Sequence, residues 1–183
     1  LLRGSEALNV RAAGVSGSHG VLVTKGGRTF SWGDGRGGRL GNGSVAPTSG
    51  AGPVRAEVLD ARRAEQLSCG AHHSAVLTRE GDVFTWGDDR YSCGLLGHGL
   101  PGRPGAGAGL PAHRAPGQPA EICWLPKRVE RWPAGAGAVT HVACGAWHTA
   151  AETEAGALFT WGCGFRGRLG HGEARGDEGF PRL

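Results

Sequence analysis

A sequence unit that occurs three times is the feature that most constrains how this chain can fold. The unit reads VSGSHGVLVTKGGRTFSWGDGRGGRLGNG from Val15, CGAHHSAVLTREGDVFTWGDDRYSCGLLGHG from Cys69 and CGAWHTAAETEAGALFTWGCGFRGRLGHG from Cys144. We interpret the shared positions as structural, because residues present in every copy describe how one unit is built. These positions are His19, His73, His148, Trp32, Trp86, Trp161, Gly33, Gly87, Gly162, Gly41, Gly97 and Gly170.

Each copy has the pattern of a β-hairpin. In the second copy the apolar run His73–Thr78 precedes a turn at Arg79–Gly81 and the alternating segment Asp82–Trp86, a pattern typical of two antiparallel strands. The other hairpins are expected at 20–24 with 29–32 and at 149–153 with 157–161, with further strands before them at 64–68 and 139–143 and after them at 55–59 and 126–130. Four short strands per unit is the number of strands in one blade of a β-propeller.

The aromatic residues of the hairpins predict how neighbouring blades meet. Phe84 and Trp86 lie two residues apart, as do their equivalents, so each pair lies on one face of its strand. We expect these faces to form the contacts between blades. Propellers close with about four to eight blades, so we expect an all-β chain of about three blades, and a sequence that is a fragment of a longer product.

Between the copies lie segments of different composition. The repeat units are expected at about 15–59, 67–130 and 142–183, all within one partial propeller over residues 1–183. Gly, Pro and Ala supply five residues each of the stretch 100–120, which is too poor in apolar residues to offset its ordering entropy. We expect a flexible solvated insertion there, and a shorter break at 46–53.

Charge and cysteine content favour an intracellular protein without a membrane segment. The net charge is +4 with scattered arginines, which makes nucleic acid or chromatin an unlikely partner without excluding it. The five cysteines form no C-x-x-C pair, as expected in a reducing compartment. No apolar run approaches about 18 residues. These features predict the cytosol or nucleus and no membrane insertion.

Motifs that suggest chemistry have simpler structural interpretations. G-x-G-x-x-G occurs at 33–38 and 162–167, but turn-like sequence follows where a nucleotide site needs a helix. A C-x-x-x-H spacing joins Cys69 to His73 and Cys144 to His148, yet repeated pairs on separate blades do not converge on one ion. The sequence therefore predicts no cofactor, no metal and no catalytic residue, and we expect a protein that is not an enzyme.

The elements CG-x-x-HS or HT, F-T-W-G and L-G-H-G resemble the regulator of chromosome condensation repeat family. This resemblance implies a seven-bladed propeller. Within the family, TWGDDRYSCGLLGHG and CGAWHTAAETEAGALFTWG look like plant proteins that join a pleckstrin-homology domain and a FYVE finger to these repeats. The chain departs from the pattern at Val15 and Ser16, which replace Cys-Gly, and at Cys163, which stands where the other copies have Asp34 and Asp88.

Function is expected in the loops, where the copies differ, because loops on a rigid scaffold are the usual binding sites. We predict a scaffold for protein–protein interaction within a larger protein. The family resemblance leaves open an exchange factor, or part of one, for a small Ran-like GTPase, and a module associated with chromatin or a ubiquitin ligase. The candidate partner-binding residues are the loop arginines Arg36, Arg39, Arg90, Arg166 and Arg168.

Overall fold

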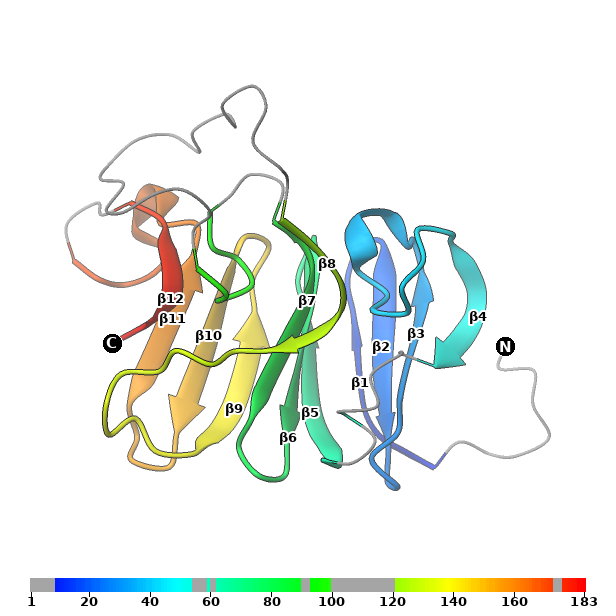
Figure 1. The fold of residues 1–183 in the computed structure, drawn as a ribbon, viewed down its shortest axis with the longest axis horizontal. Coiled ribbons are helices and arrows are strands. Elements are labelled where there is room, and N and C mark those ends of the chain that lie inside the picture. Colours follow the sequence, from blue (N-terminus) through cyan, green and yellow to red (C-terminus); the bar gives the residue numbers. More distant parts are fainter. Residues whose placement is uncertain (1–8, 54–58, 60–61, 90–92, 100–120, 173–175) are drawn as a thin grey trace.

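The computed structural model describes residues 9–53, 59, 62–89, 93–99, 121–172 and 176–183. This part of the chain forms three four-stranded antiparallel sheets that stand side by side (Figure 1), in the order that the sequence gives them. Blade 1 contains β1 (Val10–Val15), β2 (His19–Thr24), β3 (Thr29–Gly33) and β4 (Thr48–Pro53). Blade 2 contains β5 (Ala64–Cys69), β6 (His73–Thr78), β7 (Val83–Asp89) and β8 (Glu121–Arg128). Blade 3 contains β9 (Val139–Cys144), β10 (His148–Thr153), β11 (Leu158–Gly162) and β12 (Glu178–Arg182).

The predicted hairpins and the strands before them are confirmed. In blade 2 the register pairs His73 with Gly87 and Leu77 with Val83, and the other two blades repeat it. Short 3-10 turns follow the third strand in two blades, η1 (Arg36–Gly38) and η2 (Phe165–Gly167). Figure 1 places these turns at one edge of the blades, the loop edge, and the hairpin turns at the opposite edge.

The outer strands of blades 1 and 2 begin earlier in the chain than predicted. The outer strand of blade 1 is Thr48–Pro53, inside the stretch expected to be a break, because its backbone pairs with Phe30 and Ser31 of β3. An edge strand tolerates Gly and Pro. Because of these residues, the segment has no alternation of polar and apolar side chains from which a strand could be predicted. Of the predicted strand 55–59, only Leu59 is described, and it lies outside any strand. The outer strand of blade 2 begins at Glu121, five residues before the predicted start, because β7 extends to Asp89 and pairs with it.

The cores lie between the blades, as the aromatic pattern predicted. Phe84 and Trp86 of blade 2 are buried against Val21 and Val23 of blade 1. Burial of each large apolar side chain stabilises the contact by about 1.5 to 3 kcal/mol. The corresponding residues of blade 3, Phe159 and Trp161, pack in the same way against Leu77 and Val83 of blade 2. We call these contacts the first joint, between blades 1 and 2, and the second joint, between blades 2 and 3.

Two expectations concern residues outside this description. The predicted flexible insertion at 100–120 and the candidate Arg90 both fall among residues that the structure does not describe. Across the described ranges, no helix has the length and apolar character needed to span a membrane.

Candidate protein-interaction site

The first joint is bridged by the shared histidine. His19 of β2 lies with its Nε2 2.8 Å from the Ser74 hydroxyl of blade 2. That hydroxyl donates its proton to the Arg39 carbonyl of blade 1, at 3.2 Å, so it must accept from a protonated Nε2. The other ring nitrogen, Nδ1, lies 2.9 Å from the Ser16 hydroxyl. Both ring nitrogens of His19 are therefore engaged within the fold.

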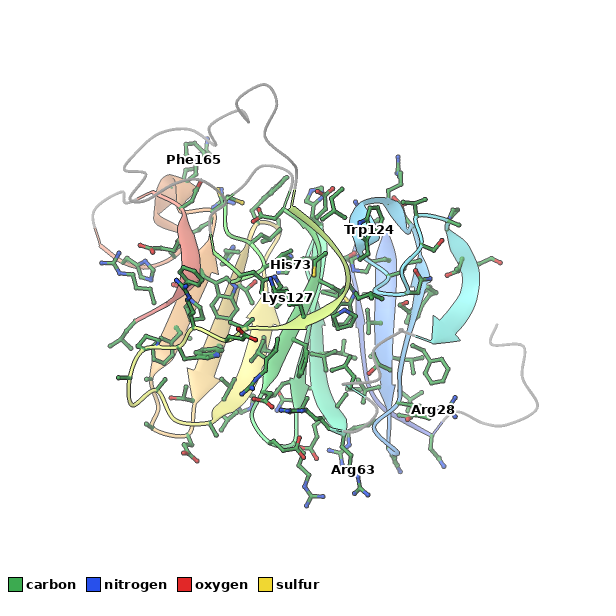
Figure 2. All side chains as sticks on the ribbon, in the orientation of Figure 1. Arg28, Arg63, His73, Trp124, Lys127 and Phe165 are labelled. Carbon is green, nitrogen blue, oxygen red and sulfur yellow. The ribbon has the colours of Figure 1, made fainter. Side chains whose placement is uncertain are left out.

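The second joint repeats this bridge with other residues. His73 Nε2 lies 2.8 Å from the Thr149 hydroxyl of blade 3, which donates to the Leu95 carbonyl of blade 2 at 3.1 Å. His73 is completely buried, and its Nδ1 has no hydrogen-bond partner among the described residues. Figure 2 shows His73 deep between the blades. Two copies of the shared histidine thus serve the same purpose, which is to fasten one blade to the next.

Burial makes these groups unsuitable for acid–base or nucleophilic chemistry near neutral pH. It lowers the pKa of His19 to about 4 and that of His73 to about 3. Burial also raises the pKa of Cys69 to about 11 and that of Cys144 to about 12. The imidazoles in the joints are thus uncharged and these thiols stay protonated. The described part of the chain also has no group of three or more His, Cys, Asp or Glu side chains that could hold a metal ion.

The shared tryptophan fills the other half of each joint. The indole nitrogen of Trp86 donates to the Arg39 carbonyl at 2.9 Å. Its ring lies so close to Gly41 of blade 1 that a Cβ there would be 2.7 Å from Nε1, and Trp161 approaches Gly97 in the same way, at 2.8 Å. Both glycines also have positive φ angles, so an L side chain is disfavoured by the backbone conformation as well as by the close contact with the indole. The repeated W-G and L-G motifs therefore describe blade contacts.

The candidate arginines have different surroundings. Arg36 is exposed and pairs with Asp34, whose carboxylate lies 2.7 Å from the guanidinium. The expectation that Arg39 is a surface residue was wrong: it is only 7 % exposed, donates to the Ser18 hydroxyl at 2.9 Å and lies 3.5 Å from Asp34. Its place before a Leu-Gly turn suggested a loop, but the turn folds inward against blade 2.

The two remaining candidate arginines that the structure describes, Arg166 and Arg168, lie close together on blade 3. Arg166 is exposed, and the half-buried Arg168 donates from Nε to the Phe165 carbonyl at 2.8 Å. Their guanidinium carbons lie 5.2 Å and 5.9 Å from the centre of the Phe165 ring, within the range of a cation–π contact. We call Phe165, Arg166 and Arg168 the blade 3 tip. Figure 2 places Phe165 at the loop edge and Arg28 and Arg63 at the hairpin edge.

Sequence reasoning missed Phe165 and did not single out the conformation of Arg166. Arg166 has φ 62°, a left-handed conformation that non-glycine residues rarely adopt. The aligned residue of blade 1 is Gly37, with φ 67°. An arginine at a position that elsewhere requires glycine was the available signal.

A shallow hollow beside the tip does not resemble a small-molecule site. Its volume is about 180 Å³, including space open to solvent, whereas ligand pockets usually enclose about 300 to 1,000 Å³. The tip is therefore better suited to contact with a macromolecular surface. The hollow is lined by Gly164, Gly167, Leu169, Gly170, His171, Gly172 and Gly176.

Sheets of four strands, joined in series by histidine and tryptophan bridges, define a repeat β-propeller protein. The chain belongs to the regulator of chromosome condensation (RCC1) repeat family. Two family models, both described as RCC1 repeat, match residues 26–77 and residues 64–96 with 139–168. The finer resemblance to plant proteins with pleckstrin-homology and FYVE domains stays a prediction, because these matches identify the repeat alone.

Relatives with this repeat are much longer than the chain. It is 34 % identical to RCC1 domain-containing protein 1 of Mus musculus, over 90 % of the chain and 46 % of the relative. It is 33 % identical to the E3 ubiquitin-protein ligase HERC2 of Homo sapiens, over 94 % of the chain and 3 % of the relative. The chain thus spans less than half the length of these relatives.

Solved structures show the same fold. The crystal structure of human WBSCR16 matches with a TM-score of 0.75 and 26 % identity, over 99 % of the chain and 41 % of that protein. Yeast RCC1 (Prp20), crystallised with Kap60, matches with a TM-score of 0.72 and 22 % identity, over 94 % and 36 % respectively. These structures support the assignment of the three sheets as propeller blades.

Proposed function

We propose that this chain is a non-catalytic interaction scaffold, and that its blade 3 tip binds an acidic surface of a protein partner. The observation that carries the proposal is the backbone of Arg166, which is left-handed and exposed where blade 1 has Gly37. A left-handed conformation costs a residue other than glycine about 1 to 2 kcal/mol. An exposed arginine that keeps such a conformation is best explained by a use outside the fold.

The chemistry of the tip supports a protein partner. Aromatic residues and arginine are enriched in protein interfaces, and two guanidinium groups lie here 5.2 Å and 5.9 Å from the centre of the Phe165 ring. Among the described residues, Arg166 has no ion pair that would neutralise it. A planar guanidinium can bind a carboxylate through two parallel hydrogen bonds. An acidic loop or helix face is therefore the partner chemistry that fits best.

The other candidate arginines contribute less to this site. Arg36 is exposed, but its charge is largely satisfied by Asp34, whose pKa the Arg36 hydrogen bond lowers to about 2. The Arg39 side chain is used within blade 1, where it donates to the Ser18 hydroxyl. We therefore expect Arg36 to add a minor contact at the same loop edge, and Arg166 to dominate.

The proposal is tested by quantitative affinity capture from cell extract with the full chain as bait. Arg166→Glu reverses the charge of the tip, and we expect at least a tenfold loss of the main captured protein. Arg79→Glu is the matched control, because Arg79 is exposed on a hairpin turn at the opposite edge, and it should capture as much as the parent chain. Equal capture by the Arg166→Glu and Arg79→Glu variants would contradict the proposal.

A second substitution separates binding from folding. Arg166→Gly removes the strain and the charge together, so it should raise the free energy of unfolding by about 1 kcal/mol while capture falls. Urea unfolding followed by circular dichroism measures the first effect. A variant that is less stable than the parent would show that the side chain of Arg166 serves the fold.

The exchange-factor alternative makes a separate prediction. The crystal structure of Prp20p from Saccharomyces cerevisiae was described together with the binding properties of that protein to Gsp1p and histones, but at 22 % identity the likeness shows the fold alone. Release of labelled GDP from a panel of small GTPases tests this alternative. Acceleration that is lost in Arg166→Glu would identify the acidic partner as a GTPase, whereas no acceleration leaves the scaffold without exchange activity.

A further inference from the structure

The two cysteines that depart from the repeat pattern meet at the second joint. Cys163 follows β11 at the position that holds an aspartate in the other blades, Asp34 and Asp88. Cys93 lies in the loop after β7 and, counted back from the shared Leu-Gly, aligns with Gly37 of blade 1. The two cysteines therefore stand at the positions that Gly37 and Asp88 occupy in the first joint.

The first joint shows that these two positions touch. A Cβ built on Gly37 would lie 2.5 Å from a carboxylate oxygen of Asp88. At the second joint the equivalent positions hold Cys93 and Cys163, which pack in the same buried cluster. They are buried in one small apolar cluster with Leu95, with Cys93 1 % and Cys163 5 % exposed.

The backbone on both sides of this thiol pair is held in place. The Asp89 carboxylate accepts from the Cys93 N–H at 3.1 Å and from the Gly94 N–H at 2.9 Å. The Cys163 N–H donates to the Trp147 carbonyl at 2.8 Å. The Cys93 thiol also donates to the Asp89 carboxylate, at 3.5 Å, so the backbone of both cysteines and the Cys93 sulfur are held in place.

We propose that Cys93 and Cys163 form a peroxide-sensitive modification site that closes to a disulfide between blades 2 and 3. The Cys163 thiolate attacks one oxygen of hydrogen peroxide, the O–O bond breaks, and the products are a sulfenic acid and hydroxide. The Cys93 sulfur then attacks the sulfenic sulfur, the S–O bond breaks, and the leaving hydroxide takes up the Cys93 proton as water. Overall, two thiols lose two electrons and two protons, and one peroxide becomes two waters.

Electrostatics assign the order of these steps. The neighbouring Cys93 thiol, with help from the Phe165 N–H and the Arg168 charge, lowers the pKa of Cys163 below that of a free thiol, against burial and Asp177. The neighbouring Cys163 sulfur, burial and the Asp89 charge raise the pKa of Cys93. Cys163 is therefore the attacking thiolate, and Cys93 is the thiol that resolves it.

The experiment treats the native full chain with hydrogen peroxide, blocks free thiols with iodoacetamide, and maps the peptides without reduction. We expect a loss of about 2 Da, the mass of two hydrogens, and a peptide that links Cys93 to Cys163 within one chain, reversed by dithiothreitol. The Cys69→Ala/Cys144→Ala double variant is the matched control and should form the same link. In Cys93→Ser a hydroxyl donor stays beside Cys163 but cannot resolve the sulfenic acid, so dimedone should label Cys163 at least tenfold more than Cys69.

Three outcomes would overturn the proposal. In the first, Cys93 and Cys163 remain reduced in folded, peroxide-treated protein. In the second, dimedone labels Cys163 in the unsubstituted chain while no link forms. In the third, non-reducing electrophoresis shows only dimers between chains. Because the unsubstituted protein gives the main readout, the test does not depend on whether a variant folds.

Discussion

The two joints share the histidine bridge but differ in the contacts of the tryptophan. Both use a histidine that bridges to a hydroxyl of the next blade. In the first joint the Trp86 indole also donates to a carbonyl, whereas the Trp161 indole nitrogen is buried without a partner among the described residues. Trp132 packs edge-on against Trp161 instead, with ring centres 5.7 Å apart at 86°. The difference teaches that the histidine bridge is the constant element, and that aromatic packing can replace the indole hydrogen bond.

The largest expected effect is a loss of stability, and it tests whether the packing at a joint stabilises the fold. Trp86→Ala empties the first joint and should lower the free energy of unfolding by about 3 to 5 kcal/mol. Trp32→Ala is the matched control, because Trp32 occupies the same position on the outer face of blade 1 and is only half-buried. It should cost roughly 1 to 2 kcal/mol. Urea unfolding gives both values, and equal losses would mean that the joint adds nothing to the burial of a tryptophan.

Acid should weaken both joints. Because burial lowers the pKa values of His19 and His73 to about 4 and about 3, only the unfolded state takes up these protons just below pH 6.5. Their contribution to stability is therefore complete above pH 6.5 and falls as the pH drops toward those values, by about 1.4 kcal/mol per pH unit for each histidine. His98 and His148, whose pKa values burial also lowers, act in the same direction.

Urea unfolding at pH 7 and pH 5 measures this loss, which should be roughly 2 kcal/mol for each joint histidine. His73→Gln should remove the part of this pH-dependent loss of stability that comes from the second joint. The part that His19 contributes in the first joint should remain. Identical stability at the two pH values would show that the histidines titrate normally in the folded protein.

The smallest effect distinguishes the two tryptophans. Trp86→Phe loses the hydrogen bond to Arg39, whereas Trp161→Phe removes an N–H that has no partner among the described residues. Trp86→Phe should therefore cost about 1 to 2 kcal/mol more than Trp161→Phe. The same unfolding assay applies, and the reverse order would indicate that the packing of Trp132 depends on the indole of Trp161.

The fold was predictable wherever side chains alternate. The hairpins and their interblade aromatics follow from the two-residue period of segments such as Val83–Asp89. The outer strand Thr48–Pro53 has no such period, because backbone pairing with β3 determines it. The fold class and the strands before and within each hairpin thus came from the sequence, and the bounds of the outer strands β4 and β8 did not.

The candidate site was predictable only in part. Sequence alone identified Arg166 and Arg168 as loop residues, but it also identified Arg39, which is buried and bonded to Ser18 within blade 1. Phe165 escaped notice because a single aromatic residue in a glycine-rich loop has no periodic signal. Contact between Cys93 and Cys163 depends on the alignment of two different blades, which the repeat pattern suggests only when the joint geometry is known.

A double-mutant cycle between His73 and Thr149 tests the central claim most directly, namely that shared repeat residues fasten neighbouring blades and leave partner binding to the loops. The cycle compares His73→Ala, Thr149→Val and the double variant by urea unfolding. The account predicts a coupling free energy of about 1 kcal/mol or more between these residues of different blades. Strict additivity of the two single effects would contradict it.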